Sequence, residues 1–286
     1  MTLVDAHHHL WDLAVRDQEW INGPRFAPLR RSFVLADLEA EIRASGVTAT
    51  VLVETVNVAE ETPEFLALAA ESDVIGAVVG WTDLTAPDVA DALSRLRSLP
   101  GGGFLRGIRH QVQGEADPDW LTRPEVLRGL RAVAEAGLVY DLVVRPHQLP
   151  AATRAAAAVP GLTFVLDHLG KPPIAAGERD PWAGWVRELA ALPNTVCKLS
   201  GMVTEADWGS WTVADLAPYA ATVLDAFGSR RLMFGSDWPV STLAAGYDDV
   251  VRATRELTAA LAPAEQADVW SGTARRVYGM TGPHAG

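Results

Sequence analysis

Short runs of apolar and β-branched residues recur along the 286-residue chain, and each is followed by a longer polar stretch with helical periodicity. The runs predict buried β-strands, and the longer stretches predict amphipathic helices. The alternation repeats eight times. Strands are expected at 3–7, 49–55, 74–81, 104–110, 138–144, 162–168, 194–201 and 231–238.

The order of these elements favours a closed parallel barrel. Most of the runs are continuously apolar, as is typical of parallel strands covered on both faces. Gly46 and Gly137 are expected to end helices, and Pro63 and Pro124 to lie in first turns. Eight βα units predict an α/β fold of the (β/α)8 or TIM-barrel type, with local distortion of the barrel allowed. An open sheet would more often carry a nucleotide-binding glycine loop after a strand. No linker interrupts the pattern, so residues 1–286 are predicted to form one domain.

Composition and charge narrow the expected partners. The chain is 49% hydrophobic and 21% charged, which suits a packed core. No apolar run approaches the roughly 20 residues of a membrane helix, and no leader pattern is visible, so a cytoplasmic protein is expected. A formal net charge of -12 opposes nucleic acid and anionic membrane partners and favours a small molecule. A homo-oligomer stays open. The single cysteine, Cys197, excludes a multi-cysteine zinc site.

Reactive side chains collect at the predicted carboxyl ends of the strands. His7 and His9 end the first strand, His110 the fourth, His168 the sixth, and Asp237 lies in the eighth. Active sites of this barrel type lie at those ends. Histidine and carboxylate groups that converge there from different strands suit the activation of water, so we expect one site at this end of the barrel.

The three consecutive histidines near the amino terminus have different expected roles. Because side chains alternate along a strand, His7 and His9 should project the same way and His8 the opposite way. The pair suits one cation or one substrate oxygen. By itself an HxH pair is a weak signal, since such a run is equally compatible with buried packing.

The segments VDAHHHLWD, GIRHQVQ, VLDHLGKP, KLSGM and FGSDWPV, in that order, resemble the amidohydrolase superfamily. The resemblance is greatest to its branch of sugar-lactone hydrolases, the L-fuconolactonase and L-rhamnonolactonase type, and GIRHQ tilts it toward aldonolactones. It spans almost the whole chain and implies a TIM-barrel hydrolase of carbohydrate metabolism.

Carried over position by position, the resemblance implies His7, His9, His168 and Asp237 as metal ligands. Binuclear relatives also use a carboxylated lysine or a glutamate on strand four and a histidine ending strand five. FLRGIRH and VYDLVV offer neither. A bridged two-metal centre is therefore not expected, and the resemblance leaves one divalent, zinc-like cation that is dispensable, or none.

The central residues have expected chemical roles. Asp237 is the first choice for general base, since it can take a proton from water and return it to the departing ring oxygen. His168 would polarise the lactone carbonyl or bind the cation. Of the consecutive Arg109 and His110, only one should face fully inward, to stabilise the carbonyl oxygen as negative charge develops, or else to pair with a loop carboxylate. Asp167 is expected to point elsewhere and to be structural.

Further residues are candidates for substrate binding. Glu54 could bind a sugar hydroxyl or act as an extra ligand, and Lys171 could contact substrate or remain a solvated loop residue. Trp11 and Trp238 follow or end strands, where an indole could stack on a sugar face or simply pack beneath loops. The segment 11–33 is long for a βα loop and is expected to cover the barrel mouth.

The leading hypothesis is hydrolysis of a sugar lactone, such as L-fucono- or L-rhamnono-lactone, by direct attack of an Asp237-activated water. No Gly-x-Ser-x-Gly nucleophile motif is present, which supports direct attack. One alternative is a metal-dependent decarboxylase of an aromatic or muconate-like acid. A second is a non-catalytic barrel that binds a sugar acid, against which the joint presence of His7, His9, His168 and Asp237 argues.

Overall fold

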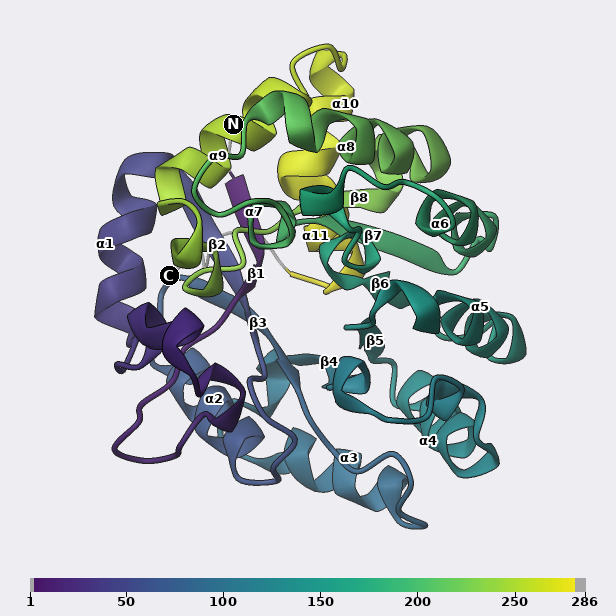
Figure 1. The fold of residues 1–286 in the computed structure, drawn as a ribbon. Coiled ribbons are helices and arrows are strands. Elements are labelled where there is room, and N and C mark those ends of the chain that lie inside the picture. The colour runs from purple at the N-terminus through teal and green to yellow at the C-terminus, as the bar shows by residue number, and fades with distance from the viewer. Residues whose placement is uncertain (1–2, 281–286) are drawn as a thin grey trace.

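Eight parallel strands in sequence order form the centre of the computed structural model, which describes residues 3–280 (Figure 1). The predicted (β/α)8 barrel is confirmed. The outermost residues of the predicted domain, 1–2 and 281–286, lie outside the described part. The strands are β1 Leu3–His8, β2 Val47–Val53, β3 Ile75–Gly80, β4 Leu105–His110, β5 Val139–Leu142, β6 Phe164–Leu166, β7 Thr195–Leu199 and β8 Leu232–Phe234.

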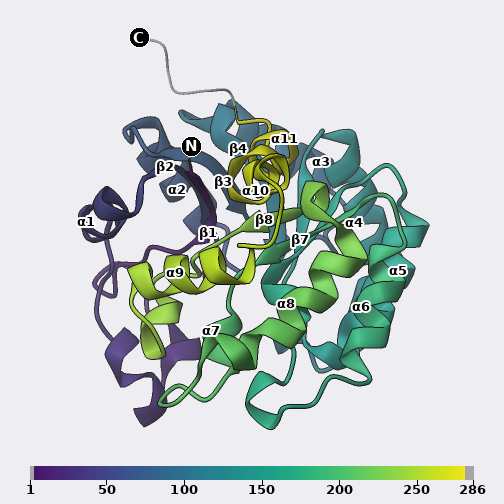
Figure 2. The same cartoon turned by 90° about the horizontal axis from the view of Figure 1, so that it is seen from above.

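Helices surround the barrel, as Figures 1 and 2 show from two directions. Gly46 ends the first helix in the left-handed conformation and Pro124 begins the fourth, as the sequence predicts. No helix within residues 3–280 is long and apolar enough to cross a membrane. The helices are α1 Leu35–Ser45, α2 Glu61–Ala70, α3 Val89–Ser98, α4 Pro124–Glu135, α5 Leu149–Ala158, α6 Trp182–Ala190, α7 Met202–Glu205, α8 Val213–Phe227, α9 Tyr247–Leu257, α10 Pro263–Ala267 and α11 Thr273–Val277.

The barrel closes through backbone contacts just beyond the ends of β1 and β8. The Asp237 amide donates to the His7 carbonyl at 2.8 Å, and the His9 amide donates to the Trp238 carbonyl at 2.7 Å. Both bonds lie at the carboxyl ends of the strands. The closure therefore places the first and last strands, and the reactive residues that follow them, side by side.

Strands β6 and β8 end earlier than the sequence predicts. His168 has φ 53° and Asp237 has φ 58°, a left-handed backbone that a strand residue does not adopt. Such conformations cost on the order of 1–3 kcal/mol each and cluster at functional sites. The chain thus leaves the strand geometry at the positions where two candidate site residues stand.

The interior of the barrel has an apolar layer, which we call the lower layer. It consists of Val4, Val51, Ala77, Val139, Val165, Val196 and Met233, and all are buried. Tyr278 and Met280, which follow α11, belong to the same cluster. The segment after α11 therefore enters the barrel from the amino-terminal ends of the strands, and Figure 1 shows α11 at the centre of the ring.

Two residues further along the strands, the inward positions carry charge. Asp141 follows Val139, Asp167 follows Val165 and Lys198 follows Val196 by one period of the strand, and Arg109 stands on β4. All four side chains are buried. We call Arg109, Asp141, Asp167 and Lys198 the upper layer.

A register shift in β1 determines the directions of the His7 and His8 side chains. Val4 and Ala6 belong to the interior cluster, so simple alternation would turn His8 inward. The pairing of β1 with β2 shifts between Asp5 and His8, as at a β-bulge. His7 consequently faces the upper layer, while the His8 Nε2 lies 3.0 Å from the Thr50 hydroxyl oxygen, outside the site.

Candidate active site

The structure brings the predicted His7, His9, His168 and Asp237 together at the carboxyl ends of the strands. The Nε2 atoms of the three histidines lie 3.9, 3.8 and 3.7 Å, respectively, from Oδ1 of Asp237. The Nε2 atoms of His7 and His9 are 3.1 Å apart. All four residues are buried. One carboxylate oxygen is therefore shared by three imidazoles.

The other nitrogen of each ring has a fixed partner. Nδ1 of His9 donates to the Val53 carbonyl at 2.8 Å, which leaves the lone pair on Nε2. Nδ1 of His168 lies 2.9 Å from the Ser200 hydroxyl. Burial lowers the pKa of His7, His9 and His168 well below the usual value for histidine, so the rings are neutral. The Nε2 atoms are thus oriented as ligands.

These residues fit one divalent cation. Donor atoms of His7, His168 and Asp237 all lie within 4.8 Å of one another, with His9 beside them. Neutral imidazoles whose Nδ1 atoms are held by other groups, together with a carboxylate, form a donor set that zinc prefers. On β4, the inward residue is Arg109, whose guanidinium is ion-paired and offers no lone pair to a metal. The residues present suit a single cation.

Below the histidines, the upper layer forms a continuous network of ion pairs. Arg109 bonds Glu54 Oε1 at 2.8 Å and Asp167 Oδ2 at 2.9 Å. Lys198 Nζ lies 3.0 Å from Asp167 Oδ1 and 2.6 Å from Asp141 Oδ2. Burial is the largest single influence and raises the pKa of Asp167, but Lys198, His7 and Arg109 together outweigh it and hold the pKa of that carboxyl well below its usual range. The charges in this layer persist because they are paired.

Asp167 corrects one expectation from the sequence. It does not point elsewhere, because Oδ1 lies 3.2 Å from Nδ1 of His7. Lys198 and Asp141 were not among the candidates. The signal that could have found them is a charged residue inside an otherwise apolar strand, at an inward position.

The side chains of Arg109 and His110 point to opposite sides of β4, as expected for consecutive strand residues. Arg109 faces inward, lines the active-site cleft and is 2% exposed. His110 turns to the outer side, where Nε2 lies 2.8 Å from Glu115 Oε1 and its ring stacks on Trp120 with centroids 4.2 Å apart. His110 is not among the described residues that line the cleft.

A cleft of about 990 Å³ opens above the four central residues. The segment 11–33 covers one side of it, and Trp20 and Phe26 from that segment line the wall. Trp208 lines it from the chain after α7, and the Arg25 guanidinium lies 4.0 Å from the Trp208 ring centroid. The mouth is thus framed by aromatic side chains from two distant segments.

The tryptophans proposed from the sequence do not reach this cleft. Trp11 is buried against Phe33, with ring centroids 5.0 Å apart, and Trp238 also packs against Phe33, with ring centroids 5.5 Å apart. Neither is among the described lining residues, whereas Trp20 and Trp208 are. An indole next to a strand end packs under the loops here, and the loops themselves supply the exposed aromatic surface.

Glu54 and Lys171 are placed differently. Glu54 is buried beside the cleft, where its Oε1 accepts from Arg109 and, at 3.0 Å, from the Gln111 amide. Lys171 lines the cleft, and its Nζ lies 3.6 Å from Glu205 Oε1. Glu54 therefore supports Arg109 and Gln111, while Lys171 faces the space that a ligand would occupy.

Asp237 is poised near neutral pH. Burial raises its pKa to about 7, against the attraction of Lys171 and Arg109. A carboxyl group with a pKa near the working pH is an effective general base. The contacts to the histidines all involve Oδ1, which leaves Oδ2 for a water molecule.

Two glycines make room for the histidine rings. A Cβ at Gly201, which has φ 62°, would meet the His168 ring at 2.5 Å. A Cβ at Gly235 would meet the His7 Cβ at 2.8 Å. The glycines of the KLSGM and FGSDW segments are thus required by close approach.

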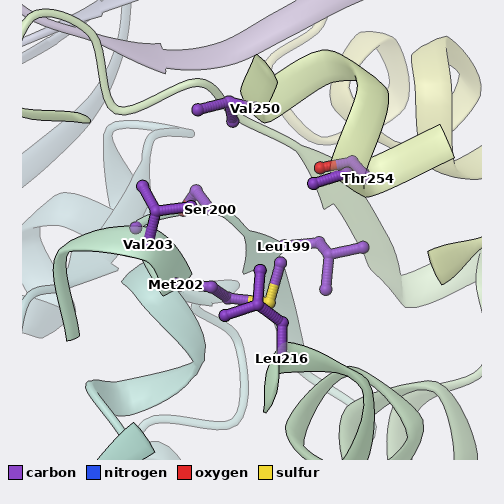
Figure 3. A pocket seen from close by; sticks show the side chains of 9 residues that line it. Leu199, Ser200, Met202, Val203, Leu216, Val250 and Thr254 are labelled. Carbon is purple, nitrogen blue, oxygen red and sulfur yellow. The ribbon is translucent and has the colours of Figure 1, made fainter. Parts of the chain in front are cut away.

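A second, much smaller pocket of about 10 Å³ lies behind β7. Figure 3 shows Leu199, Met202 and Leu216 pointing toward one another there, with Val250 and Thr254 from α9 opposite. It is barely large enough for a single water molecule. This pocket reflects packing between β7, α7, α8 and α9, and the large cleft is the candidate active site.

Comparison with known proteins agrees with the motifs. Residues 4–280 match the model of the amidohydrolase family. The chain is 40% identical to the L-fucono-1,5-lactonase of Burkholderia multivorans over 98% of this chain and 97% of that protein, and 40% identical to that of Burkholderia ambifaria over 86% and 83%. A crystal structure of an amidohydrolase from Burkholderia multivorans with bound zinc superimposes with a TM-score of 0.91 at 38% identity, covering 98% of this chain and 100% of that one.

Proposed function

The chain belongs to the amidohydrolase family, as its motifs predict, and from this premise we propose that it hydrolyses an aldonolactone of the L-fucono-1,5-lactone type. The lactone is an intramolecular ester of a sugar acid. The observation that carries the proposal is the convergence of Asp237 with three neutral histidines on the floor of a large cleft.

The arrangement supports direct attack by water. Asp237 accepts a proton from a water molecule, whose oxygen attacks the lactone carbonyl carbon. The bond between that carbon and the ring oxygen then breaks, and Asp237 returns the proton to the ring oxygen, so that a hydroxy acid leaves. Arg109, 3.4 Å from His7 Nε2, places positive charge beside the atoms where negative charge develops.

The proposed cation is a single divalent ion held by His7, His9, His168 and Asp237. When bound, such an ion supplies Lewis-acid polarisation of the carbonyl. We propose that it assists the reaction without being indispensable. Turnover that is reduced but measurable after chelation, and restored by zinc, would support this, and complete loss after chelation would contradict dispensability.

The aromatic wall of the cleft, together with ion pairing of part of its charge, supports a neutral substrate over an aromatic or muconate-like acid. Of the cations that line the cleft, Arg16 is paired with Glu64 and Lys171 lies near Glu205. Arg25 lies over the Trp208 ring, and Arg145 donates to the Gln113 carbonyl. Paired cations offer little to a free carboxylate. The aromatic wall instead suits the apolar face of a sugar ring.

Ring opening distinguishes the candidate functions. Acid release from L-fucono-1,5-lactone is followed with a pH indicator, and carbon dioxide release is followed from a panel of aromatic acids. We expect lactone opening well above the spontaneous rate and no carbon dioxide. Decarboxylation without lactone opening would overturn the proposal, and binding of the hydroxy acid without turnover of either class would indicate a non-catalytic barrel. A cytoplasmic location, and the expectation of no nucleic-acid partner, stay predictions from composition and charge.

A further inference from the structure

A fully buried lysine stands directly beneath the candidate cation site. Lys198 of β7 has no exposed side-chain surface, and its Nζ lies 2.6 Å from Asp141 Oδ2, 3.0 Å from Asp167 Oδ1 and 3.0 Å from His7 Nδ1. The ammonium group donates to the two carboxylate oxygens. Nδ1 of His7 donates to the same Asp167 Oδ1 at 3.2 Å, which leaves the lone pair of the ring on Nε2, so Lys198 acts on His7 mainly through Asp167. Among the described residues, Lys198 does not line the cleft, so it does not touch the substrate.

The lysine is anchored from the opposite end of the barrel. The Tyr278 hydroxyl donates to Asp141 Oδ2 at 2.8 Å, and Lys198 Nζ lies 5.5 Å from the centroid of the tyrosine ring. Tyr278 follows α11 at the amino-terminal ends of the strands. A chain of direct contacts therefore runs from Tyr278 through Asp141 and Lys198 to His7.

These contacts determine the orientation of the His7 ring. The ring is flanked at Nδ1 by Asp167 and by Lys198, and it makes an edge contact with the His168 ring at a centroid distance of 4.4 Å. Removal of one member of a buried ion-pair network leaves its partner uncompensated, and the remaining groups rearrange. Because His7 Nε2 is 3.1 Å from His9 Nε2, a small rotation of His7 disturbs the donor set.

We propose that Lys198 is a positioning residue, which holds His7 in the orientation that binds the cation and is itself held by Asp141 and Tyr278. The proposal rests on the proposed function in taking His7 as a cation ligand. It assigns part of the support of the active site to the segment after α11, at the far end of the barrel. Partners that orient a metal-binding histidine contribute about 10- to 100-fold to metal affinity or activity.

Two tyrosines offer a matched pair of variants. Tyr278 and Tyr140 are both fully buried, but the Tyr140 hydroxyl has no hydrogen-bond partner within residues 3–280. Zinc affinity is measured by competition with a chromophoric chelator for the whole chain, the Tyr278→Phe variant and the Tyr140→Phe variant. We expect Tyr278→Phe to weaken zinc binding by about tenfold, the lower end of that range, and Tyr140→Phe to leave it unchanged. Equal zinc affinities for the two variants would overturn the proposal.

Substitution of the lysine gives the larger effect. Lys198→Met keeps the length of the side chain and removes its charge, and we expect the zinc dissociation constant to rise by up to about 100-fold. For ring opening, kcat should fall while KM stays near that of the unsubstituted protein. A merely structural role would lower the melting temperature without this change in zinc affinity, and that result contradicts the proposal. If Lys198→Met does not fold, as judged by circular dichroism, the tyrosine pair decides.

The readouts separate this inference from the proposed function. Zinc competition needs no lactone. If the protein opens no lactone but its Tyr278→Phe and Lys198→Met variants lose zinc affinity as expected, the lactonase proposal is refuted and the role of Lys198 is supported. A chain that opens lactones and binds zinc equally well with Tyr278→Phe or folded Lys198→Met refutes only the role of Lys198.

Discussion

On β5 and β7, and at the end of β6, the lower and upper layers of the barrel interior differ by one period of two residues. Val139 and Asp141 lie on β5, and Val196 and Lys198 lie on β7. The lower residues are aliphatic and interlock with the segment after α11, whereas the upper residues are charged. One backbone alternation thus supplies packing at one end of the barrel and chemistry at the other.

The two layers are expected to contribute differently to the free energy of unfolding. Burial of aliphatic side chains contributes about 25 cal/mol for each Å² removed from water. Buried ion pairs recover little more than their desolvation cost, and apolar replacements are often equally stable. The upper layer is therefore better explained by what it holds in place, namely His7 and its neighbours, than by a contribution to folding.

The largest expected effect is at Asp237, in the active site above the upper layer. Asp237→Asn keeps the shape of the side chain but removes the general base, so turnover of the lactone should fall by about a thousandfold. Stability should not fall, because a buried charge is removed. Steady-state ring opening and thermal unfolding measure the two quantities. Survival of turnover within tenfold of the unsubstituted protein would mean that Asp237 is not the base.

A lower-layer substitution should have the opposite profile. Val165→Ala removes two buried methyl groups directly beneath Asp167, which costs about 2 kcal/mol of the free energy of unfolding. The kcat per folded molecule should be unchanged. Urea denaturation and active-site titration provide the comparison. A large loss of kcat in folded Val165→Ala would show that the two layers are not separable.

The smallest expected effect is a pair of opposite shifts in the pH profile. Burial raises the pKa of Asp237 to about 7, and the base must be ionised, so kcat/KM should decline as the pH falls through that value. Lys171 lowers the pKa of Asp237 and Glu205 raises it. Lys171→Met should therefore move the midpoint to higher pH, and Glu205→Gln to lower pH, each by a fraction of a unit. Shifts in the same direction would exclude Asp237 as the titrating group.

The fold was predictable because most strands are continuous apolar runs and the stretches between them have helical periodicity. The residues at which the strands end could not be predicted in this way. Asp167 was expected to point away from His168 because alternation was assumed to continue to residue 168. The strand ends at Leu166, and the left-handed backbone of His168 brings both side chains to the site.

The central residues were predictable from motifs, whereas their support was not. The inward position of Lys198 depends on the register of β7 in the barrel, which a single strand does not reveal. Likewise, Trp11 and Trp238 were chosen for their closeness to strand ends, but contact with the cleft depends on the path of the loops. Trp20 and Trp208 come from segments whose conformations carry no period.

The pairing of charges at the mouth of the cleft affects how the substrate enters and how the product leaves. With Arg16 and Lys171 each close to a carboxylate, and with a formal net charge of -12, the protein exerts little long-range attraction on a neutral lactone. Substrate capture should then be nearly independent of ionic strength. The hydroxy acid that forms is an anion, which the same field repels. The electrostatic field that does little for entry thus favours the departure of the product.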